Sequence, residues 1–336
     1  MKIDRKQLKD ALEKILPALA QKTLGRGPTF VFSGEYIVSF NGVIGIAYSF
    51  PTDFQAELPA EELYKIISFS DLDEIEIGLK ENVCWIKGPG LLTELSIIAE
   101  RTNIQFIEDI KKARKNLAKL PQDILEALSL CLFSVSMQNG FAALQCIAID
   151  NGYVMSTDSY RISRYKIGKF PKILIPSLAV ENILKYNIDQ YWLSDDRTKI
   201  YFIADNIVIY AQLVLSEFPS CNTYFKKNDQ TQISIPKDIL SSLNIVSVFA
   251  SNDESEKKID RQITINVLKN KWVLKARNDF GSIEKEVPCK NLAALTFLIN
   301  PFFLKEAIDK ALLLFHGDGK VLLKNDKFEH IISLGA

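Results

Sequence analysis

Histidine is scarce in this sequence, which contains only His316 and His330. No H-E-x-x-H zinc motif, no G-x-S-x-G nucleophile motif and no phosphate-binding G-x-x-x-x-G-K-[ST] loop occurs. The acidic segment 71–78 lacks the ligand spacing of an EF-hand, so we interpret it as a solvated loop that leads into a strand. These absences argue against an enzyme, and we expect no catalytic residue, no cofactor and no metal.

Cysteine is also infrequent, and no two cysteines form a C-x-x-C pair. We interpret the thiols as reduced core residues of a cytoplasmic protein. They are Cys84, Cys131, Cys146, Cys221 and Cys289. No run of about eighteen apolar residues occurs, so we expect no membrane-spanning segment. The first residues also lack the apolar stretch that is typical of a signal peptide.

The sequence has no excess of charge of either sign, because 41 Lys and Arg balance 41 Asp and Glu. This balance argues against a protein that coats DNA with a wholly basic surface, but it allows one basic face and an acidic remainder. The composition is 47% hydrophobic and 24% charged, which is typical of a globular protein. A chain of 336 residues is long enough for two or three domains.

What the sequence does contain is repetition. A helical segment occurs three times, as IDRKQLKDALEKIL, LPQDILEALSLCLF and IPKDILSSLNIVSVF. In the last two copies we expect Pro121 and Pro236 in the first helical turn, each followed by an aspartate that favours the helix start. A second helical segment also occurs three times, beginning near Pro59, Pro176 and Pro301.

Strand patterns lie between the helices, and we predict β-hairpins with turns at 33–34, 150–152 and 269–270. Another hairpin pattern follows each second helix. Chance explains one matching pair of helix starts, but it does not explain two elements that recur threefold in one order. We therefore predict an α+β protein of three tandem similar domains, 1–117, 118–228 and 229–336, each with two helices packed on antiparallel sheets.

Three tandem units of this kind resemble the bacterial sliding clamp, the β subunit of the replicative DNA polymerase. In the middle unit, YVMSTDSYRISRY is similar to the family's A-T-D-G-H-R-L-A segment. ILIPSLAVENIL resembles I-V-P-R-K-x-x-x-E-L, and FPSCNTYF resembles F-P-D-Y-x-x-V-[IL]-P, in the same order and at similar spacing. The motifs cover only the middle third, so the resemblance is to a divergent member, and a bacteriophage or prophage source fits the short chain.

The resemblance implies the DNA clamp fold, in which each chain forms half of a ring and two chains join head to tail. Such a homodimer encircles duplex DNA without sequence specificity and acts in DNA replication as a processivity factor. Its partners would be the replicative DNA polymerase and a clamp loader. The interface residues that the resemblance implies are Leu95, Ile97, Ile98, Ile245, Val248 and Phe249, although each of them could equally fill a domain core.

A clamp that slides needs Lys and Arg directed at phosphates rather than at base edges. On the paired helices they would face the hole, and our candidates are Lys6, Lys9, Lys14, Lys22, Arg26, Lys65, Lys185, Lys305 and Lys310. For any single lysine, solubility of an exposed helix face is an adequate alternative. We interpret the basic cluster within 111–119 as a solvated linker first and a DNA contact second.

The resemblance also implies a groove for partner peptides between the second and third domains. The matching positions are Ala143, on the strand before the motif, and Thr157, Asp158, Ser159, Tyr160, Arg161, Ile162, Pro219, Thr223, Tyr224, Ile331, Ser333 and Leu334. Apolar walls with a few polar groups suit peptide anchors. Thr157 and Asp158 could instead only close a turn, and Arg161 could only pair with a carboxylate. Departures from the family at Ser159, Tyr160, Asn222, Thr223 and the C-terminus predict a different peptide preference.

A second function stays open at this point. A non-catalytic scaffold or assembly protein could use the same triplicated fold without encircling DNA. The two functions differ in a measurable way, because only a ring stays on circular DNA and leaves it when the circle is cut.

Overall fold

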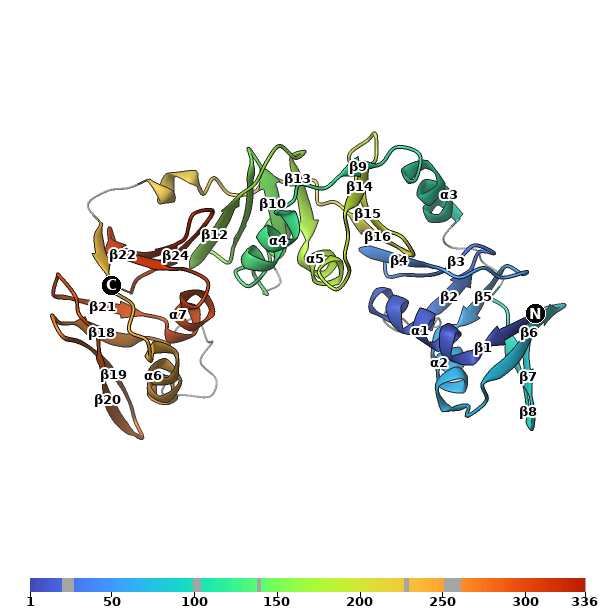
Figure 1. Cartoon of the computed structure of the whole chain (residues 1–336), viewed down its shortest axis with the longest axis horizontal. Helices are drawn as coiled ribbons and strands as arrows, with labels where there is room; N and C mark the ends of the chain where they lie inside the picture. Colours follow the sequence, from blue (N-terminus) through green and yellow to red (C-terminus); the bar gives the residue numbers. More distant parts are fainter. Residues whose placement is uncertain (20–26, 99–103, 138–139, 227–229, 251–260, 336) are drawn as a thin grey trace. The chain divides into compact units, whose positions relative to one another are not determined.

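A computed structural model of the chain describes residues 1–19, 27–98, 104–137, 140–226, 230–250 and 261–335. Within this part the chain is α+β, and one order of elements occurs three times: strand, helix, four strands, helix, three strands (Figure 1). The recurrence of this order confirms the fold class that the repeated segments predict. None of the described helices has the length and apolar character needed to cross a lipid bilayer.

The first series contains β1 (Lys2–Asp4), α1 (Arg5–Ile15), β2 (Thr29–Phe32), β3 (Tyr36–Phe40), β4 (Ile44–Ser49), β5 (Ala56–Pro59), α2 (Ala60–Phe69), β6 (Glu74–Lys80), β7 (Val83–Gly88) and β8 (Leu91–Ser96). The second contains β9 (Ala118–Lys119), α4 (Ile124–Leu132), β10 (Cys146–Asp150), β11 (Tyr153–Thr157), β12 (Arg161–Lys166), β13 (Ile173–Pro176), α5 (Ser177–Ile183), β14 (Gln190–Leu193), β15 (Lys199–Ala204) and β16 (Ile207–Gln212).

The third series contains β17 (Thr231–Ile233), α6 (Ile239–Val246), β18 (Ile263–Val267), β19 (Lys271–Asn278), β20 (Gly281–Pro288), β21 (Leu295–Ile299), α7 (Pro301–Ile308), β22 (Leu313–Gly317), β23 (Lys320–Lys324) and β24 (Phe328–Ser333). Helix α3 (Ile104–Ala113) lies between the first two series. Short 3-10 helices are η1 (Leu16–Ala18), η2 (Ala142–Gln145), η3 (Asn222–Phe225) and η4 (Ser247–Phe249).

The antiparallel sheets of the described residues run across the repeats. Two eight-stranded sheets have the orders β5-β2-β3-β4-β16-β15-β14-β9 and β13-β10-β11-β12-β24-β23-β22-β17. Each joins one series to the next through a single strand pair, β4 with β16 and β12 with β24. The remaining halves are four-stranded sheets, β1-β6-β7-β8 and β20-β19-β18-β21. In them, β8 and β20 are edge strands, as are β1 and β21 at the opposite ends.

Contacts divide the chain into two compact units rather than three. Unit 1 comprises Met1–Leu120 and Ile175–Leu215, and unit 2 comprises Pro121–Leu174 and Ser216–Ala336. Strand pairs that continue a sheet from one series into the next account for this division, because they tie neighbouring series together. The domain boundaries after residues 117 and 228 stay a prediction.

Each helix buries one apolar face against strands of its own unit. In unit 1, α1 buries Leu8, Leu12 and Ile15 and lies beside α2 (Figure 1). In unit 2, α6 and α7 pack beside each other, and the fully buried Trp272 belongs to the same core. The hairpin turns that the sequence predicts are confirmed, and positive φ angles of 50° at Asn151 and 79° at Gly152 suit their two-residue turn.

The predicted helix starts need one correction. Helices α4 and α6 begin at Ile124 and Ile239, so Pro121 and Pro236 lie before the first helical turn rather than in it. Each proline carbonyl instead accepts the N–H of the first helical residue, at 3.1 and 3.3 Å, which makes a tight turn into the helix. Among the α-helices of the described residues, only α7 carries proline as its first residue, Pro301.

Candidate functional site

The β11–β12 turn in unit 2 is held by its own polar side chains. Thr157 Oγ1 donates to the Arg161 carbonyl at 2.7 Å and accepts the Ser159 N–H at 3.1 Å. Asp158 Oδ1 accepts the N–H groups of Tyr160 and Arg161, both at 3.1 Å. Ser159 has a φ of 78°, a conformation that glycine adopts at lower cost. Thr157 and Asp158 therefore close the turn, and the Tyr160 side chain stays exposed beside it.

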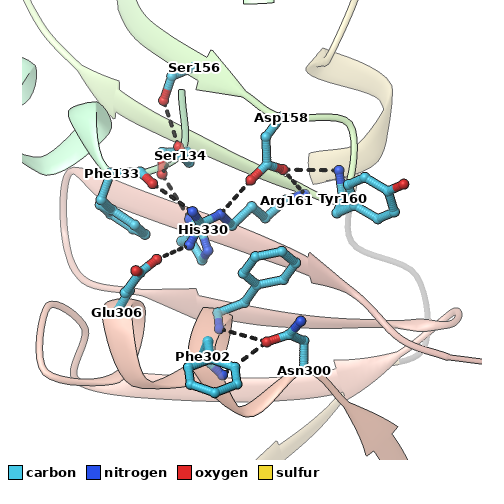
Figure 2. Close-up of polar contacts among 12 residues, drawn as sticks. Phe133, Ser134, Ser156, Asp158, Tyr160, Arg161, Asn300, Phe302, Glu306 and His330 are labelled. Carbon is cyan, nitrogen blue, oxygen red and sulfur yellow. Dashed lines mark hydrogen bonds and ion pairs between the residues drawn. The ribbon is translucent and has the colours of Figure 1, made fainter. Parts of the chain in front are cut away.

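Arg161 begins β12 and is only 7% exposed. Figure 2 shows its guanidinium between two carboxylates, with Nε donating to Asp158 Oδ2 at 2.8 Å and Nη1 to Glu306 Oε2 on α7. Nη2 donates to the Phe133 carbonyl at 2.7 Å, and the Phe303 ring centroid lies 4.4 Å from the guanidinium carbon. A buried charge is tolerated where it is paired and hydrogen-bonded in this way. Arg161 thus links the turn to α7 and to Phe133, the residue directly after α4.

A chain of buried hydroxyl groups continues from this point across the β12–β24 junction. Ser134 Oγ lies 2.6 Å from Ser156 Oγ and donates to Ser163 Oγ at 2.7 Å. Ser163 Oγ lies 2.8 Å from Nδ1 of His330 on β24. These bonds satisfy polar groups that would otherwise destabilise the core.

His330 is fully buried between the rings of Phe133 and Phe328. Its Nε2 has no hydrogen-bond partner among the described residues. Burial lowers the pKa of His330 well below its usual value, and the positive charges of Arg161 and Lys310 lower it further. The imidazole is therefore neutral in the folded protein.

An apolar cluster lies on the other side of the same strand pair. Ile162 and Ile331 are directly opposite each other on β12 and β24. They are buried with Cys221, Phe225 and Leu322, and Phe218 and Phe315 pack against the cluster. The segment around η3 therefore lies against the β12–β24 junction, as the peptide-groove prediction requires of its walls.

Exposed residues surround this cluster. The Ser333 N–H donates to the Tyr160 carbonyl at 2.9 Å, and Lys320 Nζ donates to the Tyr224 carbonyl at 2.8 Å. Pro219 and Thr223 are exposed, and Leu334 is half-buried. The structure thus brings the β11–β12 turn, the η3 segment and the C-terminal strand together within unit 2. Ala143 differs from the expectation, because it lies in η2 rather than on a strand and is fully buried.

None of the five cysteine thiols has a lowered pKa that would make it reactive. Burial raises the pKa of Cys84 and of Cys146 to about 11. Burial also raises the pKa values of Cys131, Cys221 and Cys289. Because thiolates are the reactive form of cysteine, these side chains are poor nucleophiles. The described residues contain no cluster of three His, Cys, Asp or Glu side chains placed to hold a metal ion.

Solved DNA polymerase sliding clamps are similar to this chain over its whole length. The clamp from Bacillus subtilis has a TM-score of 0.84 at 14% sequence identity, covering 100% of this chain and 98% of that chain. The DNA polymerase III beta chain from Streptococcus pneumoniae TIGR4 has a TM-score of 0.83 at 14% identity, with 100% and 99% covered. The chain has the sliding-clamp fold. No protein-family model and no curated protein matches the sequence.

The lysines predicted to face DNA in this sliding-clamp fold are mostly engaged with neighbouring side chains. Lys6, Lys9 and Lys65 form ion pairs with Asp73, Glu13 and Glu61, at 3.5, 3.6 and 2.7 Å. Lys14 donates to the Tyr48 hydroxyl, and Lys185 donates to Asn182 Oδ1. Lys185 and Lys310 lie just beyond the ends of α5 and α7, and Lys305 lies within α7. Lys22 and Arg26 lie outside the described residues.

The residues predicted for the interface between chains differ in exposure. Ile245 on α6 and Val248 on η4 are exposed, and Phe249 on η4 is half-buried. Val248 and Phe249 thus lie on the 3-10 helix that follows α6, not on α6 itself. Leu95 on β8 is buried in its own unit, whereas Ile97 and Ile98 follow the strand and are half-buried.

Sequence reasoning did not find the polar network around Arg161. It considered a carboxylate partner for Arg161, but the second carboxylate, Glu306, lies 145 residues away in the chain. No role was predicted for His330 from the sequence. The signal that was available is the two-residue spacing within each strand: Ser156, Ser163 and His330 lie two residues from Val154, Tyr165 and Phe328, so each lies on the same face as a large buried side chain.

Proposed function

We propose that this protein is a sliding clamp, a processivity factor that encircles duplex DNA as a head-to-tail homodimer. The supporting observation is that β8 and β20 are sheet edges. The equivalent strands of the other series pair with each other across the series, β4 with β16 and β12 with β24. An unpaired edge exposes a row of N–H and C=O groups and favours pairing with another chain. A contact between two different edges also repeats from copy to copy, and it can close into a ring.

In this ring, lysines on the paired helices contact phosphates and leave the bases unread, so that the DNA can slide. The candidates in the described part are Lys6, Lys9, Lys14, Lys65, Lys185, Lys305 and Lys310. The ion pairs of Lys6, Lys9 and Lys65 with acidic neighbours reduce the local positive potential and weaken the binding of DNA. A weak grip suits a protein that is retained by topology rather than by affinity.

The apolar cluster at the β12–β24 junction is the proposed docking site for peptide tails of the DNA polymerase and other clients. Tyr160, Thr223 and Tyr224 are exposed around it and supply aromatic and polar contacts. Arg161 is buried and paired, so its role in this proposal is to hold the β11–β12 turn rather than to bind the peptide. A clamp loader would open the ring, and the protein itself would carry out no catalysis.

Retention on circular DNA tests this function. The protein is assembled on a nicked circular plasmid, in one arm by a bacterial clamp loader with ATP and in another without a loader at high protein concentration. Gel filtration then measures the protein that stays with the plasmid before and after a restriction enzyme cuts it. We expect retention on the circle and loss from the linear DNA.

A scaffold with the same fold gives a different result. Binding that is equal on circular and linear DNA, or no retention in either loading arm, would contradict DNA encirclement. A plasmid whose linear ends are blocked by bound streptavidin is the control, because a ring cannot leave it by sliding off.

A further inference from the structure

The edge strand β8 directs alternate backbone groups away from its sheet. The Ile97 N–H donates to the Asn82 carbonyl at 2.9 Å, just past the β7–β8 pairing. Because backbone groups alternate in direction along a strand, the odd-numbered residues of β8 bond to β7. Leu92, Glu94 and Ser96 therefore direct their N–H and C=O groups outward.

The edge strand β20 shows the same alternation. The Cys289 N–H donates to the Asn270 carbonyl at 3.0 Å, so the odd-numbered residues of β20 bond to β19. Glu284 and Glu286 direct their backbone groups outward. Pro288 also occupies an outward position, where its missing N–H costs no hydrogen bond within the sheet.

The two internal junctions share one strand register. Tyr48 on β4 lies opposite Ile207 on β16, and Tyr165 on β12 lies opposite Phe328 on β24. Ile207 and Phe328 each come directly after the two-residue turn of the last hairpin in their series. Tyr48 lies one residue before Ser49, which pairs with Tyr36 at the start of β3. Tyr165 lies one residue before Lys166, which pairs with Tyr153 at the start of β11.

The equivalent residues on the open edges are Leu91 and Val287. Leu91 comes directly after the two-residue turn between β7 and β8. Val287 lies one residue before Pro288, which pairs with Lys271 at the start of β19. We propose that β8 of one copy pairs with β20 of another copy in the register that puts Leu91 opposite Val287. In this register Glu94 lies opposite Glu284, and the repulsion between the two carboxylates opposes ring closure. This inference rests on the proposed ring.

Two further observations support this register. Glu94 and Glu284 both direct their backbone groups outward, so they can exchange both N–H···O=C bonds, whereas a shift by one residue would leave the outward groups unmatched. The same register places Leu95 opposite Ile283 on the core face, where both side chains are at least half-buried. The register therefore places apolar side chains opposite each other on one face of the continued sheet.

The carboxylate pair has no counterpart at the internal junctions. The equivalent positions there hold Ile162 opposite Ile331 and Gly45 opposite Tyr210. Side chains directly opposite each other have Cβ atoms about 5 Å apart, and like charges at that distance are destabilising. The contact between copies is thus the junction at which like charges meet.

Neighbouring charges do not remove the repulsion. Lys275 on β19 pairs with Glu284, with 2.7 Å between Nζ and Oε2, and compensates that carboxylate in part. Glu94 forms no ion pair among the described residues and lies opposite Trp85 on β7. Lys87, two residues along the same face of β7, has its Nζ 4.7 Å from the Trp85 ring centroid rather than on the Glu94 carboxylate. Salt screens exposed charges, so higher ionic strength strengthens this contact, opposite to its effect on an interface held by ion pairs.

Sedimentation velocity of the full chain at 50 and 500 mM NaCl tests the charge effect. We expect the higher salt to lower the dimer Kd, and Glu94→Gln to lower it about fivefold at 50 mM because two such pairs close each ring. The variant should also lose most of the salt dependence. Glu181→Gln on α5 removes the same charge away from both edges and should behave as the parent protein.

The outcomes separate this inference from the proposed function. A chain that stays monomeric at every concentration and salt overturns the ring and this inference with it. A dimer whose Kd is unchanged by Glu94→Gln, or weakened by salt, leaves the ring standing and overturns the opposed carboxylates.

Cysteine cross-linking tests the register directly. Thr93→Cys with Lys285→Cys, in a Cys289→Ser background, places the two thiols opposite each other in a pair with a Cα separation of about 4.5 Å, which a disulfide spans. Oxidation should then give covalent dimers. Thr93→Cys with Glu286→Cys puts the thiols on opposite faces, and cross-linking of that pair in preference to the first would refute the register.

Discussion

Arg161 illustrates at the scale of one residue how a predicted contact residue can have a structural role. The sequence places it in the motif that resembles the peptide groove, and it also allows a simple ion pair. The structure gives it two carboxylates and a carbonyl as partners while leaving it almost fully buried. The residue type and its place at the start of a strand were predictable, but its partner Glu306 was not, because that contact depends on how distant segments pack.

His330 makes the stability of unit 2 depend on pH. Its folded-state pKa is depressed by burial and by Arg161 and Lys310, so below the unfolded value of about 6.5 the unfolded chain binds more protons than the folded one. Stability is therefore fully present above pH 6.5 and falls as the pH drops toward the folded-state pKa. The expected slope reaches about 1.4 kcal/mol per pH unit.

Urea unfolding between pH 5 and 8 measures this slope. In a Trp85→Phe, Trp192→Phe background, the intrinsic fluorescence comes from Trp272 and reports on unit 2. His330→Gln keeps a hydrogen-bonding group beside Ser163 but cannot titrate, so its stability should change much less with pH. His316→Gln is the matched control; burial lowers the pKa of His316 as well, but that ring is only half-buried, so its removal should leave most of the slope. An unchanged slope in His330→Gln would refute the assignment.

At the scale of secondary structure, local signals predicted the hairpins well and the helix starts less well. The turns at 33–34 and 150–152 follow from Gly34, Asn151 and Gly152, which adopt positive φ, and this is a property of the turn alone. The turn at 269–270 forms without a positive φ. The starts of α4 and α6 are different. A proline followed by an aspartate suits the first helical turn, yet the structure uses the proline carbonyl to form a turn before the helix.

Gly152 offers a test of this turn. With a φ of 79°, it adopts a conformation that costs a non-glycine residue roughly 1 kcal/mol, and a Cβ there would meet only the Ile167 carbonyl, at 3.5 Å. Gly152→Ala should therefore lower the free energy of unfolding by about 1 kcal/mol through backbone strain rather than through a clash. Gly168→Ala is the control, because a Cβ there meets nothing within 4 Å. Thermal denaturation of the two variants should show a lower melting temperature only for Gly152→Ala.

At the scale of the whole molecule, the threefold repeat was readable from the sequence, but the continuity of the sheets was not. Similar helix starts at similar spacing reveal duplicated units without reference to their packing. The pairing of β4 with β16 and of β12 with β24 depends on contacts between residues more than a hundred positions apart. That pairing also explains why contacts divide the chain into two units although its elements follow three series.

The ion pairs on α1 and α2 predict how the affinity for DNA changes when their acidic residues are neutralised. Glu13→Gln with Glu61→Gln removes the acidic partners of Lys9 and Lys65, and should raise the affinity for a short duplex about fivefold at 50 mM salt. The gain should shrink as salt screens the lysines. Fluorescence anisotropy with a labelled duplex measures both effects.

Glu62→Gln with Glu108→Gln is the matched control, because these exposed acids form no ion pair among the described residues. It makes the same change in net charge. Equal gains from the two double variants would show that only net charge matters and that Lys9 and Lys65 do not face the duplex.

Pro288 has a consequence for copies that have not yet met a partner. A chain that pairs its β8 edge with the β20 edge of another copy can add further copies without limit if the ring does not close, and it then grows into a fibre. Pro288 removes one hydrogen-bond donor at the end of the β20 edge and so shortens the template available to a stray strand. Pro288 thereby limits the uncontrolled edge-to-edge addition of further copies to newly made protein.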